Sequence, residues 1–209
     1  MARGPLVEPH WLARLDAAVA RTASAPDLAT LRGVEGEGAR NYFALLRAVL
    51  RPAFAFPKRT RRPPADPINA LLSLGYTLLT QNLMAACEIV GLDPYDGFLH
   101  SDRYGRPSLA LDLVEEFRSV IVDSVVLNLV NRGRVQTNDF EPGPEGGVYL
   151  KRAAQRIFFA AYSARLQTEV LYAPANRRLS YQKLFEVQAR RLRKVIEGES
   201  AVYEPFLTR

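Results

Sequence analysis

The stretch LALDLVEEFRSVIVDSVVLNLV, residues 109–130, decides the fold of this chain. Fourteen of its 22 residues are apolar, more than the single apolar stripe of a surface helix requires. The pattern therefore predicts a helix that is buried around most of its circumference. Asp112 and Glu115 lie three positions apart on it, about 60° apart around the axis. Because buried carboxylates are costly, these two and the neighbouring Glu116 need a cation, a metal ion or a shifted protonation state.

Outward from this helix, the spacing of apolar residues predicts a mainly helical chain. The fold class expected is all-α with one small β-hairpin near residues 134–150, in which residues 135–139 pair with residues 147–150. The expected division is an N-terminal helical extension (1–26), one helical domain that carries the site (27–200) and a C-terminal tail (201–209). The further helices are expected at residues 9–21, 28–50, 68–90, 151–173 and 180–197.

Composition excludes several classes of protein. With 48% hydrophobic and 24% charged residues in 209, the chain can offset the entropy of ordering a core, so disorder is excluded for most of it. No run approaches the roughly 18 uninterrupted apolar residues of a membrane span, and no export signal is visible. The single cysteine, Cys87, excludes an intramolecular disulfide and a multi-cysteine zinc site, and its apolar surroundings indicate an inert core thiol.

The net charge of +6 is unevenly distributed. Residues 151–209 hold 12 Lys and Arg against 5 Asp and Glu, whereas residues 1–150 hold 16 against 17. A local basic excess suggests an anionic partner, although a solvated helix face accounts for part of it. Residues 51–67 carry five prolines and five basic residues, which fits either a mobile arm near a phosphate backbone or an ordinary surface loop. Three glycines in residues 33–38 of a predicted helix indicate close approach by another backbone or a ligand.

A candidate site combines a histidine with the carboxylates of the buried helix. His100 ends the stretch GFLH, twelve residues before Asp112, across a turn that can fold back over the start of the helix. Such an oxygen-rich, nitrogen-containing set suits Mn²⁺ or Mg²⁺ better than zinc. The alternative is that Arg103, Arg106, Arg118 or the basic C-terminal helices pair with the carboxylates, and that the histidine is an ordinary side chain.

The residues resemble a known family, the CRISPR-associated integrase Cas1, over about residues 27–207. The motifs are RGVEGEGARNYF (32–43), DPINALLSLGYTLL (66–79), GLDPYDGFLH (91–100), DRYGRPSLALDLVEEFR (102–118) and GGVYL (146–150), followed by RLQTEVLY, LSYQKLFEVQARRL and YEPF. The resemblance is to the C-terminal, catalytic helical domain of the family. Members of the family are metal-dependent DNA endonucleases and integrases that insert spacers into a CRISPR array in the prokaryotic cytoplasm.

The resemblance implies roles for individual residues. It assigns Glu35, His100 and Glu115 as ligands of Mn²⁺ or Mg²⁺, and Asp112 as an additional catalytic acid that supports the site. Glu37 is the nearby competitor for Glu35, but the family's carboxylate directly follows the hydrophobic residue after RG. Tyr76 matches a positioning tyrosine near the active centre. The matching residue Asn69 is expected to cap a helix or to serve the structure.

The resemblance also gives the basic residues a partner, double-stranded DNA from the protospacer and the CRISPR repeat. No motif for reading bases is visible, so specificity is expected from DNA shape and from partners. Those partners are further copies of the chain in a dimer or tetramer, the small Cas2 protein and a fused or associated reverse transcriptase. The residues expected to contact DNA are Arg59, Arg61, Arg62, Tyr76, Arg103, Arg106, Lys183, Arg190, Arg191, Arg193 and Lys194.

The chain departs from the family pattern at its start. Typical members carry an N-terminal β-rich domain that helps to form the dimer, and residues 1–26 are too few to supply it. A compact integrase, the integrase portion of a larger polypeptide and a truncated piece are all compatible with this length. Two other functions remain open: a catalytically silent DNA-binding or scaffolding domain, and a nuclease of branched DNA outside CRISPR adaptation.

Overall fold

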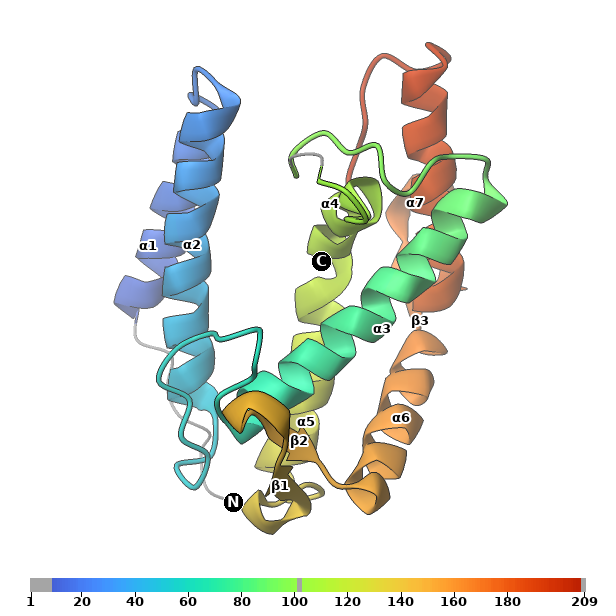
Figure 1. Ribbon diagram of the computed structural model, residues 1–209. Coiled ribbons are helices and arrows are strands. Elements are labelled where there is room, and N and C mark those ends of the chain that lie inside the picture. The colour runs from blue at the N-terminus through green and yellow to red at the C-terminus, as the bar shows by residue number, and fades with distance from the viewer. Residues whose placement is uncertain (1–8, 101–102, 208–209) are drawn as a thin grey trace.

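A computed structural model describes residues 9–100 and 103–207. Its long helices form two groups, a two-helix pair and a larger helical body (Figure 1). The described α-helices are α1 (Pro9–Thr22), α2 (Leu28–Val49), α3 (Pro67–Ile89), α4 (Ser108–Arg118), α5 (Ser124–Asn131), α6 (Arg152–Leu166) and α7 (Tyr181–Ile196). The mainly helical class expected from the sequence is confirmed.

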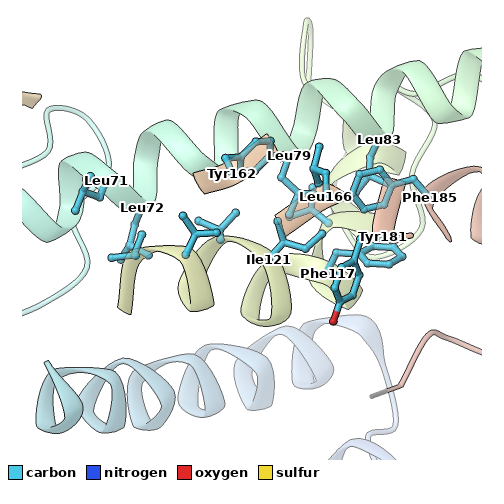
Figure 2. Packing of buried hydrophobic residues seen from close by; sticks show 14 of the residues in the cluster. Leu71, Leu72, Leu79, Leu83, Phe117, Ile121, Tyr162, Leu166, Tyr181 and Phe185 are labelled. Carbon is cyan, nitrogen blue, oxygen red and sulfur yellow. The ribbon is translucent and has the colours of Figure 1, made fainter. Parts of the chain in front are cut away.

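Helix α3 runs through the centre of the body. The Asp66 side chain caps its first turn by accepting the Asn69 backbone N–H at 2.9 Å, and Pro67 occupies the first helical position. Leucines along α3 meet aromatic and aliphatic side chains of α4, α6 and α7 (Figure 2). Gly75 is required at the crossing, because a Cβ there would lie 2.4 Å from a methyl carbon of Val122. By length and composition α3 alone among the described helices could cross a membrane, but it is the core helix here.

The predicted helix at residues 109–130 is present but not continuous. A π-helical turn, η1 (Ser119–Asp123), separates α4 from α5. Such a turn inserts an extra residue and rotates the helix that follows. The carbonyl oxygen of Val120 in this turn accepts the Ser124 hydroxyl and the Arg165 Nε–H, at 2.7 and 2.8 Å. The apolar run correctly predicts that the segment is buried. It does not predict the π-helical turn, because the residues remain apolar on both sides of it.

Two small antiparallel hairpins accompany the helices. In the first, β1 (Phe140–Pro142) pairs with β2 (Val148–Leu150). The hairpin near residues 134–150 is therefore confirmed, but its first strand begins later than predicted. The second joins β3 (Glu169–Tyr172) to β4 (Arg177–Ser180), around a turn in which Asn176 adopts a left-handed conformation. The predicted helix over residues 151–173 is wrong beyond Leu166, because the chain turns there into a short strand whose side chains are alternately exposed and at least partly buried, a period that a helical spacing count does not detect.

The last described residues are docked on the body, and do not extend away from it. Phe206 is buried and stacks on Phe117, with ring centroids 5.4 Å apart. The Glu116 carboxylate accepts the Phe206 backbone N–H at 2.7 Å, and also bonds the hydroxyl of Tyr203. Glu116 thus holds the C-terminal segment to α4. Cys87 is buried in the core, and this burial raises the pKa of its thiol to about 11, as an inert thiol requires.

Candidate functional site

Asp112 organises the loop that carries His100. Its Oδ2 accepts the backbone N–H groups of Phe98 and Leu99, at 2.7 and 3.0 Å. Its Oδ1 accepts the backbone N–H of His100 at 3.0 Å and lies 2.6 Å from the ring Nδ1. Burial alone raises the pKa of Asp112, but these hydrogen bonds outweigh it and hold the pKa below its usual value. The carboxylate is therefore ionised at neutral pH and fixes both the loop and the ring.

The loop reaches Asp112 because it lies directly on the start of α4. A Cβ at Gly97 would fall 2.6 Å from the Cβ of Ser108, so only glycine permits this approach. The Pro94 carbonyl accepts the backbone N–H groups of Leu109 and Ala110, at 3.0 and 3.2 Å. These contacts satisfy donors that a helix start leaves unpaired.

The pairing of His100 with Asp112 leaves one ring nitrogen available. With Nδ1–H donated to a carboxylate, the ring carries its free lone pair on Nε2, as metal-binding histidines commonly do. Among residues 9–100 and 103–207, Nε2 has no hydrogen-bond partner. His100 is therefore oriented for a further contact through Nε2.

Glu115 lies one helical turn beyond Asp112 and is bound to an arginine. Its Oε2 accepts from Arg118 at 2.7 Å. The Arg118 guanidinium lies over the rings of Tyr76 and Phe43, 5.1 and 5.5 Å from their centroids. Burial opposes the charge of Arg118, but Tyr76 and Glu115 beside it keep the pKa above its usual value. Arginine pairing was the alternative to a metal, and for Glu115 the structure shows it.

Glu35 projects from α2 and is exposed. Arg32, one turn earlier, donates through Nε and Nη2 to the Leu99 carbonyl, at 2.8 and 2.6 Å. The segment of α2 that carries Glu35 is thereby tied to the residue next to His100. A Cβ at Gly33 or Gly36 would meet no atom of the described chain within 4 Å, so no segment described here makes the close approach that these glycines indicated.

The carboxylates and the histidine do not form a closed ligand set. Within the described ranges, no three His, Cys, Asp or Glu side chains converge closely enough to hold a metal ion. The donor types of Glu35, His100 and Glu115 nevertheless fit Mn²⁺ or Mg²⁺, and each has an atom to which no residue of the described ranges makes a hydrogen bond. The assignment of these three as metal ligands remains a prediction.

The proline-rich loop at residues 51–67 is anchored to the body. Arg59 turns inward, donating to Asn69 Oδ1 at 2.8 Å and to Ser73 Oγ at 3.1 Å, and lies over the Tyr76 ring. Burial lowers the pKa of its guanidinium to about 10. The prediction that Arg59 contacts DNA as part of a mobile arm therefore does not match its placement. Asn69, which also accepts the Thr60 backbone N–H, serves the structure as expected.

The other residues predicted to contact DNA differ in their exposure and in whether they are paired with a carboxylate. Arg61, Arg62 and Arg103 are exposed, and Arg106 is partly exposed. The basic residues of α7, by contrast, each lie within 4 Å of a glutamate carboxylate. The pairs are Lys183 and Arg190 with Glu186, Arg191 with Glu204, Arg193 with Glu197, and Lys194 with Glu199. Arg191 and Arg193 are held further, by the Tyr172 hydroxyl at 2.7 Å and the Val90 carbonyl at 2.9 Å, whereas the exposed pairs of Lys183, Arg190 and Lys194 are weak.

Sequence reasoning overlooked Asp123, which is 1% exposed at the end of the π-helical turn. Its Oδ2 accepts the Tyr42 hydroxyl at 2.6 Å and its Oδ1 accepts the Tyr76 hydroxyl at 2.5 Å. Tyr76, expected near the active centre and against DNA, thus directs its hydroxyl to a buried acid. The available signal was an aspartate in the middle of an apolar helix, where it needs a partner.

The fold and the site define a mainly helical domain in which a carboxylate-held histidine lies beside exposed arginines. The family model described as CRISPR associated protein Cas1 matches residues 9–164, and the chain belongs to this family. It is 47% identical over 196 residues to the CRISPR-associated endonuclease Cas1 3 of Thermus thermophilus, covering 94% of this chain and 59% of the relative. The chain therefore spans about three fifths of that relative's length.

Solved structures share the fold. A casposase bound to integration product aligns with a TM-score of 0.83 and 25% identity, covering 93% of this chain and 57% of that chain. A chain of a Cas6-RT-Cas1–Cas2 complex aligns with a TM-score of 0.85 and 26% identity, covering 96% of this chain and 22% of that chain. The comparisons confirm the family that the motifs indicated.

Proposed function

We propose that this chain is the catalytic part of a DNA integrase and endonuclease of CRISPR adaptation that depends on a divalent metal ion. The observation that carries the proposal is the Asp112–His100 pair, in which Asp112 holds Nδ1 of His100 and lies one helical turn from Glu115 on α4. The endonuclease name of the Thermus relative and the casposase bound to integration product support the reaction class. The proposed substrates are a protospacer with 3′-hydroxyl ends and the repeat of a CRISPR array.

In the proposed reaction, the 3′-oxygen of the incoming strand forms a bond to a phosphorus at the repeat boundary. The bond from that phosphorus to its original 3′-oxygen breaks, and the displaced strand departs with a 3′-hydroxyl. With water as the nucleophile, the same exchange gives endonuclease cleavage. Glu35, His100 and Glu115 would hold a Mn²⁺ or Mg²⁺ ion. When bound, the ion would activate the attacking oxygen and stabilise negative charge on the phosphate.

The chain's own residues supply orientation and charge. Asp112 keeps Nδ1 of His100 engaged, so that Nε2 is the ring atom that faces the substrate side. Arg61 and Arg62 on the anchored loop, and Arg103 and Arg106 a few residues after His100 in the sequence, are at least partly exposed and are expected to neutralise phosphates. The weakly paired cations of α7 contribute when a phosphate replaces their glutamates. Because these contacts release counterions, DNA binding is expected to weaken steeply with salt.

The proposed partners follow the family. A homo-oligomer and the Cas2 protein are expected to complete the assembly, and a reverse transcriptase is a further candidate, because the aligned complex contains both Cas2 and a reverse transcriptase.

The test is strand transfer by the 209-residue chain, with a short duplex bearing 3′-hydroxyl ends, a repeat-containing plasmid and MnCl₂, with and without Cas2. Joining should be lost in His100→Ala and Glu35→Ala. Glu37→Ala is the matched control, because Glu37 lies two residues from Glu35 and pairs with Arg21 on α1 at 2.6 Å. Joining that survives both site variants would refute the site assignment.

The same assay separates the alternatives. Salt-dependent DNA binding without joining under any metal would assign a scaffolding role. Products cleaved at branch points and never joined would assign a branched-DNA nuclease outside adaptation.

A further inference from the structure

Helix α2 contacts the body through a few apolar side chains, among them Leu46 and Phe43, and through several hydrogen bonds. Only Val34 and Leu46 of its residues are buried. Hydrogen bonds attach it at both ends: Arg32 donates to the Leu99 carbonyl, and the Asn131 amide donates to the Val49 carbonyl at 2.9 Å. The apolar contacts of Leu46 and Phe43 attract without a preferred direction, so the rotation of α2 about its axis depends on these hydrogen bonds.

The contact in the middle of α2 is the most buried of these attachments. Tyr42 reaches the Asp123 carboxylate, whose second oxygen accepts the hydroxyl of Tyr76 from α3. One carboxylate thus joins α2, α3 and the α4–α5 segment, which are far apart in sequence. A hydrogen bond to an acceptor buried away from water is stronger than one exposed to water, and it is directional.

This contact lies on the face of α2 that carries Glu35. Tyr42 follows Glu35 by seven residues, which places the two side chains about 20° apart around the axis and two turns apart along it. Fixing the Tyr42 hydroxyl on Asp123 therefore fixes the rotation of α2 that sets the direction of Glu35.

The position of Asp123 is itself determined by the π-helical turn. The extra residue rotates Asp123 toward α2 and α3, while Gly75 lets α3 approach Val122 of the same turn. Tyr76 is the residue next to Gly75, so this close crossing delivers its hydroxyl to the carboxylate. Arg118, which binds Glu115, covers the Tyr76 ring. The cluster of Asp123, Tyr42 and Tyr76 thus lies on the Glu35 face of α2 and against the arginine that binds Glu115.

We infer that Asp123, with Tyr42 and Tyr76, is a positioning clamp that holds the Glu35 face of α2 against the segment bearing His100 and Glu115. The inference rests on the proposed function for its catalytic consequence. Its structural consequence, the immobilisation of α2, stands without that function. None of the three residues is assigned contact with the reacting atoms.

The test compares Tyr42→Phe with Tyr162→Phe. Each removes one hydroxyl and keeps the ring, and Tyr162 is a matched control because its hydroxyl donates to Asn82 at 2.8 Å, away from α2. Hydrogen exchange of α2 should accelerate about tenfold in Tyr42→Phe and stay unchanged in Tyr162→Phe. In strand transfer, kcat should fall about tenfold to a hundredfold in Tyr42→Phe while KM for DNA is unchanged.

Asp123→Asn provides a second variant, because an amide keeps the shape and one acceptor oxygen but replaces the other acceptor oxygen with an NH₂ donor. It should accelerate exchange in α2 and also in the adjoining part of α3. Equal exchange of α2 in Tyr42→Phe and Tyr162→Phe would overturn the clamp. Faster exchange with unchanged kcat would overturn its positioning role. If the wild-type chain joins no DNA, the proposed function fails and the exchange measurement alone decides the clamp.

Discussion

The two faces of the α4–α5 segment are held in opposite ways. Toward α3, Phe117, Ile121 and their neighbours form a tightly packed apolar interface (Figure 2). Toward α2, apolar contacts are fewer, and hydrogen bonds that include the Tyr42–Asp123 contact add direction to the attachment. Apolar contacts supply free energy without direction, whereas hydrogen bonds supply direction with a modest net free energy. The molecule thus separates the interface that stabilises it from the interface that orients its proposed site.

The largest effect should come from the apolar face. Phe117→Ala removes a buried ring that contacts Phe185 and Phe206, so it should lower the free energy of unfolding by about 3–5 kcal/mol. Urea denaturation followed by circular dichroism measures this loss. Phe159→Ala is the control, because Phe159 is 43% exposed on α6 and should cost far less. Equal losses would mean that the Phe117 ring contributes no more to stability than an exposed ring.

Adding a methyl group at Gly75, where α3 crosses the π-helical turn, should lower the free energy of unfolding by a smaller amount. Gly75→Ala places a methyl group against Val122 and must push α3 away from the π-helical turn, at about 1–3 kcal/mol. Thermal unfolding measures the loss. Because the shift also moves Tyr76, hydrogen exchange at residues 119–123 should rise. An unchanged melting temperature would show that the two helices have room to separate.

A pH dependence tests the one carboxylate buried beside Phe117. Burial raises the pKa of Glu116 despite hydrogen bonds from Tyr203, Phe206 and Gln188. The folded state therefore binds this proton more tightly than the unfolded state does, and its stabilising effect is lost as the pH rises from about 4.3 through the raised pKa. The difference in unfolding free energy between wild type and Glu116→Gln should fall with pH, by at most about 1.4 kcal/mol per unit. A difference that grows with pH would contradict the raised pKa.

The polar face should respond locally to loss of a single contact. Asn131→Ala removes the bonds to the Val49 carbonyl and the Arg51 N–H, and should cost about 1 kcal/mol, with faster hydrogen exchange at the end of α2. Asn128→Ala on the same helix is the control, since that side chain is exposed and the described structure gives it no side-chain hydrogen bond. Faster exchange in the α3 core would argue against separate interfaces.

The smallest effect should be an increase in stability, from a substitution at Gly36. Gly36→Ala adds a methyl group that meets no atom within 4 Å in the described structure, so it should stabilise α2 by up to about 1 kcal/mol. Thermal unfolding measures the gain. If a DNA strand passes close to the glycines beside Glu35, strand transfer should fall while stability rises. Activity that rises with stability would assign Gly36 no role in substrate approach.

The helices could be predicted wherever an apolar stripe and a cap coincided. Asp27 and Asp66 cap α2 and α3 at the predicted starts, and burial of residues 109–130 followed from apolar content alone. The π-helical turn and the second hairpin were not predicted, because one leaves the apolar pattern intact and the other has little apolar pattern. The partnership of His100 with Asp112 could be expected from a turn of twelve residues. The inward placement of Arg59 could not, since it depends on Asn69 and Ser73.

The sequence by itself determined the helical class, the family and the identity of the candidate ligands, because periodicity, caps and motifs are local properties of the chain. Only the tertiary structure decided which charged side chains are paired within the protein and which are not. In the folded chain, Glu115 pairs with Arg118, and Glu116 bonds the C-terminal segment. Each basic residue of α7 lies beside a glutamate. Asp123 accepts hydrogen bonds from α2 and α3. The physical reason is that a hydrogen bond or ion pair depends on distance in space, and segments 47 and 81 residues apart meet only once the core has formed.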